Sequence, residues 1–285
     1  MNSTPARPVV LETIAEVRDA LAGASSLALV PTMGALHDGH LALVERAREV
    51  AETVVVSIFV NPLQFGEGED LDKYPRTFED DLDLLATLGV NYVFAPTAAE
   101  LYPTTPIQTT VRAGGVATLF EGRSRPGHFD GVLTVVAKLL NIVRPQFVLF
   151  GQKDAQQVFL VSRMVTDLNL PVTVEVVETV REDDGLARSS RNRFLDDRER
   201  RAARVLSQAL EAAESSADRG IDSVIAAAQS VLMGEPLVTL DYFAVVKPST
   251  FQPVDDDYRG PATVLIAARV GETRLIDNER IRLGG

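Results

Sequence analysis

The chain has 285 residues, of which 46% are hydrophobic and 24% charged, which is typical of a globular protein with one large core or two domains. Its net charge of −12 argues against nucleic acid or an anionic membrane as the main partner. The absence of cysteine excludes disulfides and thiol catalysis and is in keeping with a cytoplasmic protein. No apolar run is long enough to span a bilayer, and the first residues lack the apolar core of a signal peptide.

The first elements predicted are an amphipathic segment over residues 9–22 and a buried parallel strand over 27–30. Pro31 is expected to end this strand, and helical spacing of apolar residues begins after Gly39. His37 and His40 therefore lie where a strand passes through a loop into a helix N-terminus. The unpaired N–H groups and the positive dipole end at such a junction suit a phosphate group.

Two other interpretations of this histidine pair stay open at this point. His37 and His40 could be ordinary surface residues, although the chain has only three histidines and the third, His128, also lies among glycines. A metal site is the weaker alternative, because zinc needs three or four ligands and the chain offers no cysteine and one further histidine.

The next segments alternate between predicted strands and helices. Strands are expected over 53–60 and 92–95, with a polar loop after Asn61 that contains Gln64 and Tyr74. A helix is expected to begin at Thr77 as its N-cap, where Asp80 and Asp81 would at least compensate the helix dipole. This alternation predicts a parallel α/β sheet whose polar loops gather at the carboxyl ends of the strands.

The middle of the chain carries further cationic groups. Residues 120–131 are predicted to be a flexible, glycine-rich stretch with Arg123, Arg125 and His128, followed by an apolar helix up to Pro145. A strand over 147–150 runs into Lys153, which is well placed for a phosphate, and a helix covers 156–168. At its start we expect one of Gln156 and Gln157 to face a pocket and the other to face solvent.

The composition changes after a last strand over 172–177. Residues 179–193 form a loop rich in hydroxyl and guanidinium groups, a good shape for a triphosphate, although a Ser-Ser-Arg sequence by itself is more often solvated surface. Helices over 198–218 and 221–232 and antiparallel strands over 239–246, 263–270 and 273–276 follow. We place the domain boundary at 180, with a Rossmann-like parallel sheet and helices on both faces in 1–180 and a smaller α+β domain in 181–285.

Taken together, these loops resemble the pantoate–β-alanine ligase (pantothenate synthetase) family within the HxGH nucleotidylyltransferase superfamily. HDGH alone would indicate only the superfamily, but the segments occur in the family's order and spacing across the N-terminal domain. The matching segments are PTMGALHDGH (31–40), VSIFVNPLQF (56–65), DLDKYPRT (70–77), GHFDGVLTVVAKL (127–139), FGQKDAQQ (150–157) and DGLARSSRN (184–192).

The resemblance implies ATP-dependent formation of pantothenate, AMP and pyrophosphate from pantoate and β-alanine through a pantoyl adenylate. It also implies Mg²⁺, a homodimer and a C-terminal domain that acts as a lid. The triphosphate and catalytic contacts would be His37, His40, Lys153, Ser189, Ser190 and Arg191, with His40 as acid or electrostatic stabiliser. The nucleotide site would be completed by Pro31, Thr32, Met33, Gly34, Gly151, Asp154, Val180 and Arg188.

The resemblance assigns the remaining site residues to pantoate and to magnesium. Gln64 and Gln157 match the pair that binds pantoate, and Asp80 or Asp81 is the candidate Mg²⁺ contact. The residues expected to line the pocket are Asn61, Tyr74, Arg125 and His128. Two positions differ from the usual family pattern: Arg188 replaces a hydrophobic residue before Ser-Ser-Arg, and Gln152 replaces the acid of GEKD.

Two competing functions remain to be weighed against the ligase. A nucleotidylyltransferase for another phosphate-bearing substrate would need a basic pocket for that phosphate, whereas the loop after the second strand offers Asn61, Gln64 and Tyr74. An ATP-binding regulatory module without catalysis would most easily have lost His40 or Lys153, and both are present.

Overall fold

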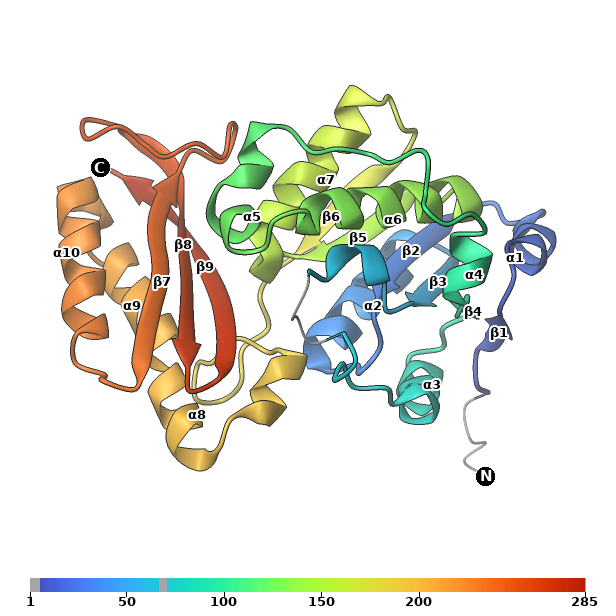
Figure 1. Cartoon of the computed structure of the whole chain (residues 1–285), viewed down its shortest axis with the longest axis horizontal. Coiled ribbons are helices and arrows are strands. Elements are labelled where there is room, and N and C mark those ends of the chain that lie inside the picture. Colours follow the sequence, from blue (N-terminus) through green and yellow to red (C-terminus); the bar gives the residue numbers. More distant parts are fainter. Residues whose placement is uncertain (1–5, 67–70, 285) are drawn as a thin grey trace. The chain divides into compact units, whose positions relative to one another are not determined.

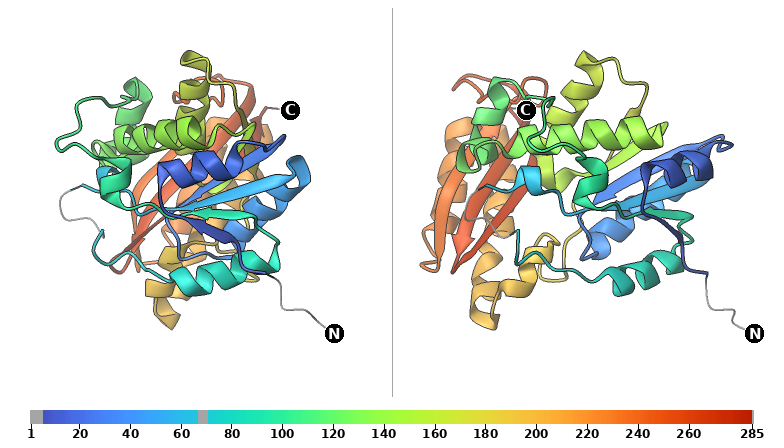
Figure 2. Two further views of the ribbon diagram at one scale, coloured as in Figure 1. Left: turned by 90° about the vertical axis from the view of Figure 1, so that its right-hand side faces the viewer. Right: turned by 45° about the vertical axis from the view of Figure 1, so that its right-hand side comes forward.

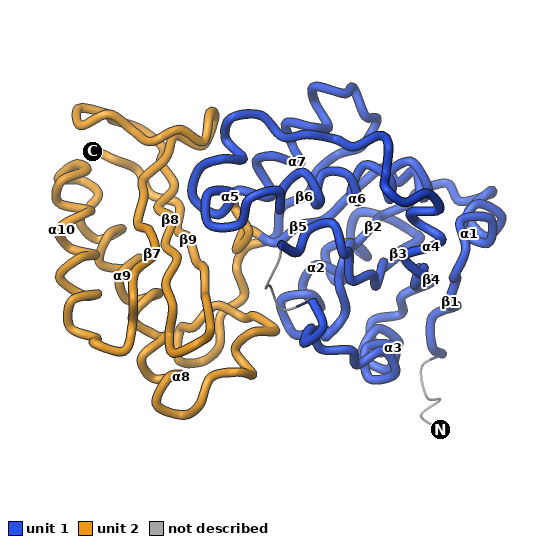
Figure 3. Tube along the Cα trace, viewed as in Figure 1, with its two compact units in different colours: residues 1–151, 156–177 blue, residues 152–155, 178–285 orange. Residues whose placement is uncertain are grey.

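The computed structural model describes residues 6–66 and 71–284, so Asp70 of the DLDKYPRT segment lies outside the described residues. The chain forms two compact units, one of residues 1–151 and 156–177 and the other of residues 152–155 and 178–285 (Figure 3). The role of the C-terminal domain as a lid stays a prediction. Within the described part of the chain, no helix is long and apolar enough to cross a membrane.

The first unit is built on a six-stranded sheet in the order β1-β4-β3-β2-β5-β6, with every pair parallel. Helices cover both faces of this sheet (Figures 1 and 2), which confirms the predicted fold class. The elements in chain order are β1 (Val9–Leu11), α1 (Ile14–Leu21), β2 (Leu27–Thr32), α2 (Asp38–Val50), β3 (Thr53–Ile58), α3 (Phe78–Thr87), β4 (Tyr92–Phe94), α4 (Ala98–Leu101), α5 (Phe120–Ser124), α6 (His128–Val143), β5 (Phe147–Gly151), α7 (Ala155–Asp167) and β6 (Thr173–Val177).

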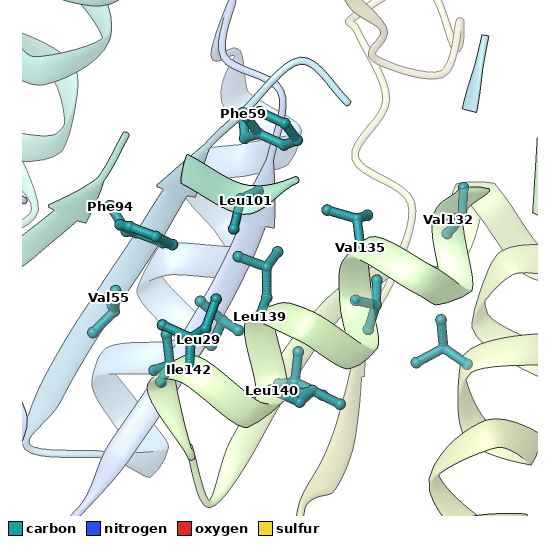
Figure 4. Close-up of a cluster of buried hydrophobic side chains, with 14 of the residues drawn as sticks. Leu29, Val55, Phe59, Phe94, Leu101, Val132, Val135, Leu139, Leu140 and Ile142 are labelled. Atoms are coloured by element: carbon teal, nitrogen blue, oxygen red, sulfur yellow. The ribbon is translucent and has the colours of Figure 1, made fainter. Parts of the chain in front are cut away.

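Alternate residues of the central strands point to opposite faces of the sheet, and each set is buried in its own apolar cluster. Leu29 and Val55 pack with α1, α6 and α7 on one face, and Figure 4 shows part of this cluster. Val30 and Val54 pack with α2 and α3 on the other face. The sheet is therefore covered on both sides, and its ligand-accessible edge is the carboxyl end of the strands.

The strand order reverses between β2 and β5, which are neighbours although α2, β3, α3 and β4 separate them in the sequence. Such a reversal is the usual place for a ligand in an open α/β sheet, because the connections leave the two strands in opposite directions. The histidine segment follows β2, and Gly151 ends β5.

The second unit has a three-stranded antiparallel sheet in the order β7-β8-β9, with a helical layer that shares its apolar core. Ala209 and Val224 of the helices are buried together with Val264 and Ile266 of the central strand. Its elements are α8 (Asp197–Ala203), α9 (Val205–Glu214), α10 (Ile221–Leu232), β7 (Val238–Val246), β8 (Gly260–Val270) and β9 (Thr273–Leu283).

Several element predictions were wrong at their boundaries. Residues 9–22 hold the strand β1 before α1, because Thr13 forms a capping box with Glu16 and starts the helix only at Ile14. The predicted helix over 198–218 is two helices that meet at Arg204. The last strand runs to Leu283 and not to Ile276, since its whole length pairs with β8.

Strand β2 also continues through Pro31 to Thr32 instead of ending before the proline. Pro31 stands opposite Ser57 of β3, whereas the paired residues of β5 stop at Leu29. The missing N–H therefore removes no ladder bond on the β5 side. On the other side the Thr32 Oγ1 hydroxyl donates to the Ser57 carbonyl at 2.7 Å.

Most of the stretch 120–131 is helical, since α5 and the start of α6 occupy it, and His128 is buried. The flexibility expected there stays a prediction. Only Gly127, with φ +81°, uses the conformational freedom of glycine there. Gly131 is needed for close packing, because a Cβ atom on it would lie 2.2 Å from the Leu63 carbonyl oxygen. Helix α6 thereby approaches the loop that carries Gln64.

Candidate active site

The loop between β2 and α2 is held by a carboxylate from another part of the chain. Gly34 and Ala35 have φ angles of +82° and +52°, so this loop has two consecutive residues in the left-handed region. The amide N–H groups of Ala35 and Leu36 each donate to one oxygen of Asp81, both at 2.9 Å. Asp81 lies in the first turn of α3, and its side chain is a clamp on the histidine loop.

Asp81 is almost fully buried, with 1% of its surface exposed, and it also accepts a 3.1 Å hydrogen bond from the Thr77 hydroxyl. Thr77 is the N-cap residue by position, but its side chain binds Asp81 and makes no capping bond to the backbone. A carboxylate with both oxygens engaged by backbone amides is poorly suited to an ion. The geometry therefore disfavours Asp81 as the Mg²⁺ contact, while Asp80 is exposed on the same turn.

The rings of the two histidines lie against each other at the N-terminus of α2, with their planes tilted by 35°. His37 is the N-cap residue and His40 is the third residue of the helix, with ring centroids 4.1 Å apart. The His37 Nδ1 atom accepts the Gly39 N–H at 3.2 Å, and the His40 Nδ1 atom accepts the His37 N–H at 3.3 Å. Each ring thus satisfies one backbone donor of the helix start.

These bonds determine where the ring protons lie. A nitrogen that accepts a hydrogen bond carries no hydrogen, so both rings are in the tautomer with the hydrogen on Nε2. The two half-buried side chains are then Nε2–H donors beside the positive end of a helix. This arrangement can bind and stabilise a negatively charged phosphate, and the helix itself fixes the donors.

A chain of hydrogen bonds fixes the side chain of Gln64. The Tyr102 hydroxyl donates to Asn61 Oδ1 at 2.8 Å, and Asn61 Nδ2 donates to Gln64 Oε1 and to the Gly131 carbonyl, both at 3.1 Å. Gln64 Nε2 lies 3.1 Å from the Met33 sulfur atom. Burial raises the pKa of the Tyr102 hydroxyl, so the hydroxyl keeps the proton that it donates.

Arg125 and His128 hold the backbone of the same loop. The His128 Nδ1 atom is 2.8 Å from the Gln64 carbonyl oxygen, and an Arg125 nitrogen is 3.4 Å from it. Another Arg125 nitrogen lies 3.1 Å from His128 Nε2. A carbonyl only accepts and a guanidinium only donates, so His128 is neutral with its hydrogen on Nδ1. Both residues shape the Gln64 loop.

The remaining predicted residues of the first unit have different surroundings. Tyr74 is buried, and its ring meets that of Phe65 edge to face at 6.2 Å. Gln157 is half-buried in the first turn of α7. Gln156 is buried, and it accepts the Glu121 N–H and donates to the carbonyls of Val116 and Leu119. It therefore does not face solvent, and which of the two glutamines faces a pocket stays a prediction.

In the second unit, Lys153 lies in the short turn Gln152–Asp154. Its side chain is 18% exposed, and the ammonium nitrogen lies 3.9 Å from an Asp154 carboxylate oxygen. The exposure of the side chain is low for a lysine and shows that most of its stem is packed.

The Ser-Ser-Arg segment follows a narrow hairpin of the second unit. Arg188 N–H donates to the Val180 carbonyl at 2.9 Å, and Arg181 and Ala187 form an antiparallel bridge. Ser189 caps a 3₁₀ turn, Ser190–Phe194, by accepting the Arg191 N–H. This places Val180, Arg188 and the two serines at one end of the hairpin.

Asn192 ties the segment to the hairpin. Its Nδ2 atom donates to the Ala187 carbonyl at 3.0 Å and to a Glu182 oxygen at 2.8 Å. Glu182 also accepts a hydrogen bond from Arg200. Asn192 belongs to the DGLARSSRN segment, but no role was predicted for it. The two bonds give it a structural role, which is to hold the Ser-Ser-Arg segment on the hairpin.

A family model described as pantoate-beta-alanine ligase matches residues 9–280 of this chain. The chain belongs to the pantoate–β-alanine ligase family. A pantothenate synthetase from Leifsonia xyli is 58% identical over 99% of this chain and 96% of its own length. Another from Thermobifida fusca is 52% identical over 97% of this chain and 96% of its own.

Solved structures agree with this assignment. A pantothenate synthetase from Thermus thermophilus is 48% identical and superposes with a TM-score of 0.91, covering 95% of this chain and 98% of its own. A pantoate-beta-alanine ligase from Francisella tularensis, solved in complex with beta-gamma ATP and beta-alanine, is 32% identical with a TM-score of 0.79. It covers 95% of this chain and 97% of its own.

The two departures from the usual ligase pattern are accommodated locally. Arg188 has an acidic partner, because its guanidinium lies 3.8 Å from a Glu182 oxygen. Gln152 is buried, with 9% of its surface exposed, where a charged acid would be desolvated. Each departure therefore agrees with the charge and burial of its surroundings.

Two structural roles were not predicted from the sequence, those of Tyr102 and of Asp81. Tyr102 lies just after α4 and outside every quoted motif, so no spacing pattern connected it with Asn61. Asp81 was considered only as a dipole or magnesium residue, although a buried carboxylate generally needs donors. Across residues 6–66 and 71–284, no three His, Asp or Glu side chains are grouped to hold a metal ion.

The role of His37 in catalysis can be separated from its role as a helix cap. We expect His37→Asn to keep the cap, because Asn is a favourable N-cap residue, while His37→Ala loses about 1 kcal/mol of stability. Both substitutions remove the Nε2–H donor and should lower the adenylation rate about 10²–10³-fold. Thermal unfolding and single-turnover rates measure the two effects, and a normal rate for His37→Asn would contradict the donor role.

Asp81→Asn should loosen the histidine loop. An amide presents one oxygen where the carboxylate presents two, so either Ala35 or Leu36 N–H would face an NH₂ group. We expect a loss of about 1–3 kcal/mol in the free energy of unfolding and a lower kcat at saturating magnesium. Asp80→Asn, on the exposed side of the same turn, is the control for stability and should change it by less than about 0.5 kcal/mol. Equal stability of the two variants would argue against the clamp.

Glu182 makes the stability of the second unit dependent on pH. Burial alone would raise the pKa of Glu182, but the hydrogen bonds from Arg200 and Asn192 outweigh it and lower this pKa below its ordinary 4.5. Ionised Glu182 therefore stabilises the fold above pH 4.5, and this contribution is lost as the pH falls through the folded-state pKa. Glu182→Gln should cost about 1–3 kcal/mol at pH 7.

The difference between wild type and Glu182→Gln should narrow as the pH falls from 7 to 3. Urea unfolding at several pH values measures this difference directly. If the difference in the free energy of unfolding stays constant from pH 7 to pH 3, the charge of Glu182 contributes nothing to stability.

Proposed function

We propose that this chain is an ATP-dependent ligase that joins pantoate to β-alanine through a pantoyl adenylate. The observation that carries the proposal is the His37–His40 pair, whose Nδ1 atoms accept backbone N–H groups at the start of α2. The family match over residues 9–280 supplies the substrates. A module that only binds ATP would not require two imidazoles held in one tautomer by backbone N–H groups.

The first step transfers the adenylyl group. A pantoate carboxylate oxygen attacks the α-phosphorus atom, the bond from that phosphorus to the bridging oxygen breaks, and pyrophosphate leaves. His37 and His40 would donate to the phosphate oxygens on which charge grows, His40 serving as acid or electrostatic stabiliser. Lys153, Ser189, Ser190 and Arg191 would bind the remaining triphosphate oxygens.

The second step forms the amide. The β-alanine nitrogen attacks the acyl carbon, the mixed anhydride bond breaks toward AMP, and the ammonium proton passes to solvent. Gln64 and Gln157 would hold the pantoate hydroxyls as neutral amides, which adds no charge against the substrate carboxylate. Arg125 and His128 would act through the Gln64 backbone, to which they are bonded, and Tyr74 through its packing on Phe65.

The remaining residues would contact the nucleotide, as the family resemblance implies. The residues assigned to it are Pro31, Thr32, Met33, Gly34, Gly151, Asp154, Val180 and Arg188. Gly34 suits this position, because its φ of +82° lets the loop turn sharply next to the phosphate-binding helix.

Magnesium would enter as the ion of MgATP. The described residues form no cluster that could hold a resident ion, and Asp81 is occupied by the histidine loop. Asp80 is the carboxylate that we propose as an outer contact to the ion, with phosphate oxygens and water as the main ligands. A cytoplasmic location and a homodimer complete the proposal, the first supported by the cysteine-free sequence and the second by the family alone.

The decisive experiment is the release of pyrophosphate without β-alanine. ATP and pantoate alone should give about one pyrophosphate per active site, because the adenylate forms before the amine is needed. His40→Ala should reduce the rate of this burst while the same protein still binds ATP. If pyrophosphate appears only after β-alanine is added, the two-step order is wrong. If a phosphate-bearing acceptor replaces pantoate with equal efficiency, the chain is another nucleotidylyltransferase.

A further inference from the structure

The turn that carries Lys153 is held by a side chain from a distant part of the sequence. Asn278 lies in β9, and only 1% of its surface is exposed. Its Nδ2 atom donates to the Gln152 carbonyl at 2.8 Å and to the Lys153 carbonyl at 2.9 Å. The turn and the strand belong to the same compact unit.

The Nδ2 group of Asn278 matches this position, whereas its Oδ1 atom is buried without a hydrogen-bond partner. Its nitrogen carries two hydrogens, and the two bonds use both of them on successive carbonyl groups. The amide orientation is fixed, because the reverse orientation would place Oδ1 against two carbonyl oxygens. The Gln152 and Lys153 carbonyls lie in a partly buried turn and would otherwise need other donors. Asn278 satisfies both of them.

The position of Asn278 is fixed in turn by a buried ion pair. Asn278 N–H donates to an Asp277 oxygen at 2.8 Å, and the Asp277 carboxylate accepts bonds from two nitrogens of Arg181, at 2.6 and 3.3 Å. Arg181 lies at the base of the hairpin that leads to Ser189. The turn of Lys153 and the hairpin before the serines are therefore fastened to neighbouring residues of one strand.

Lys153 is also within electrostatic reach of this strand. Burial raises the pKa of the Asp277 carboxyl, and the Lys153 ammonium is one of the charges that act against this effect, together with Arg181. The Lys153 ammonium therefore acts electrostatically on Asp277, the residue before Asn278 in β9.

We propose that Asn278 is a positioning residue for Lys153, which it holds in place by binding the two carbonyls of the Gln152–Lys153 turn. The inference rests on the proposed role of Lys153 at the triphosphate. A lysine is a flexible point charge on a four-carbon stem, so its value in a transition state depends on where its backbone is fixed. Lys153 follows β5 of the parallel sheet in the sequence, but the residue that fixes its backbone lies in β9 of the antiparallel sheet.

The simpler alternative is that Asn278 only stabilises the fold. Rate constants in two backgrounds distinguish the two roles. A residue that acts through Lys153 should matter only while Lys153 is present, whereas a general loss of structure should lower the rate whether Lys153 is present or not.

The experiment uses Asn278→Ala and Asn278→Asp, each alone and combined with Lys153→Ala. Pyrophosphate release is measured in single turnovers at saturating ATP and pantoate, at a temperature where circular dichroism shows every variant folded. We expect each Asn278 variant to lower the rate of pyrophosphate release about 10–100-fold. Asn278→Asp should be the slower of the two variants, because its carboxylate oxygens would face two carbonyl oxygens. In the Lys153→Ala background the same substitutions should change the rate less than twofold.

Ile281→Ala is the matched control. Ile281 is also buried on β9, with 6% of its surface exposed, and it belongs to the apolar core of the second unit. Its truncation should lower the thermal midpoint and leave the single-turnover rate within about twofold of wild type. Should Asn278→Ala fail to fold, Asn278→Ser keeps one donor in a smaller side chain, and its rate is compared in the same two backgrounds.

The outcomes separate this inference from the proposed function. A normal rate for Lys153→Ala would overturn the role of Lys153 and the inference with it. A slow Lys153→Ala with normal Asn278 variants would leave the proposed function intact and overturn only the positioning role. Equal losses from Asn278 substitution in both backgrounds would show that Asn278 is structural.

Discussion

The candidate site of the first unit depends on hydrogen-bond acceptors for the backbone N–H groups of the loop between β2 and α2. These N–H groups take part in no strand ladder or helix. Ala35 and Leu36 are buried, and their N–H groups would cost about 1–3 kcal/mol each without acceptors. The Asp81 carboxylate accepts both. Because α2 begins immediately after this loop, the carboxylate fixes the backbone that leads into the helix and its two imidazoles, while Leu43, Val44 and Ala47 pack the helix on the sheet.

The same solution recurs in other described loops that carry candidate site residues or lie beside them. Side chains with amide or carboxylate groups reach from other elements and satisfy the loop backbone, as Asn192 does for Ala187 and Gln156 for Val116 and Leu119. These side chains have no part in the proposed chemistry. They make loops as fixed as the strands that they follow, which is what catalysis by positioning requires.

The central strands and the sheet class were predictable from the sequence, because runs such as residues 53–58 are apolar on both faces and only a doubly covered sheet buries them. A helix start near Gly39, beside the two histidines, was predictable from local spacing, and the helix begins one residue before this glycine. The role of Asp81 was not, since a carboxylate in a first helical turn has the same pattern whether it compensates a dipole or binds a loop 45 residues away. The glycines of 120–131 suggested a flexible loop where the chain forms α5 and the start of α6. The sequence pattern is ambiguous there, because glycine serves both flexible segments and close packing.

The route of the chain between its two units restricts how the protein can be divided. The chain enters the second unit for residues 152–155, returns to the first for α7 and β6, and enters the second again at residue 178. A shortened chain that ended at Val177 would keep the Lys153 turn but lose Asn278, so the turn would be left without its anchor. Recombination between relatives at that boundary would likewise separate a turn from the strand that fits it. The two units are therefore expected to be inherited together, with the turn and its strand changing in step, although each unit has its own core.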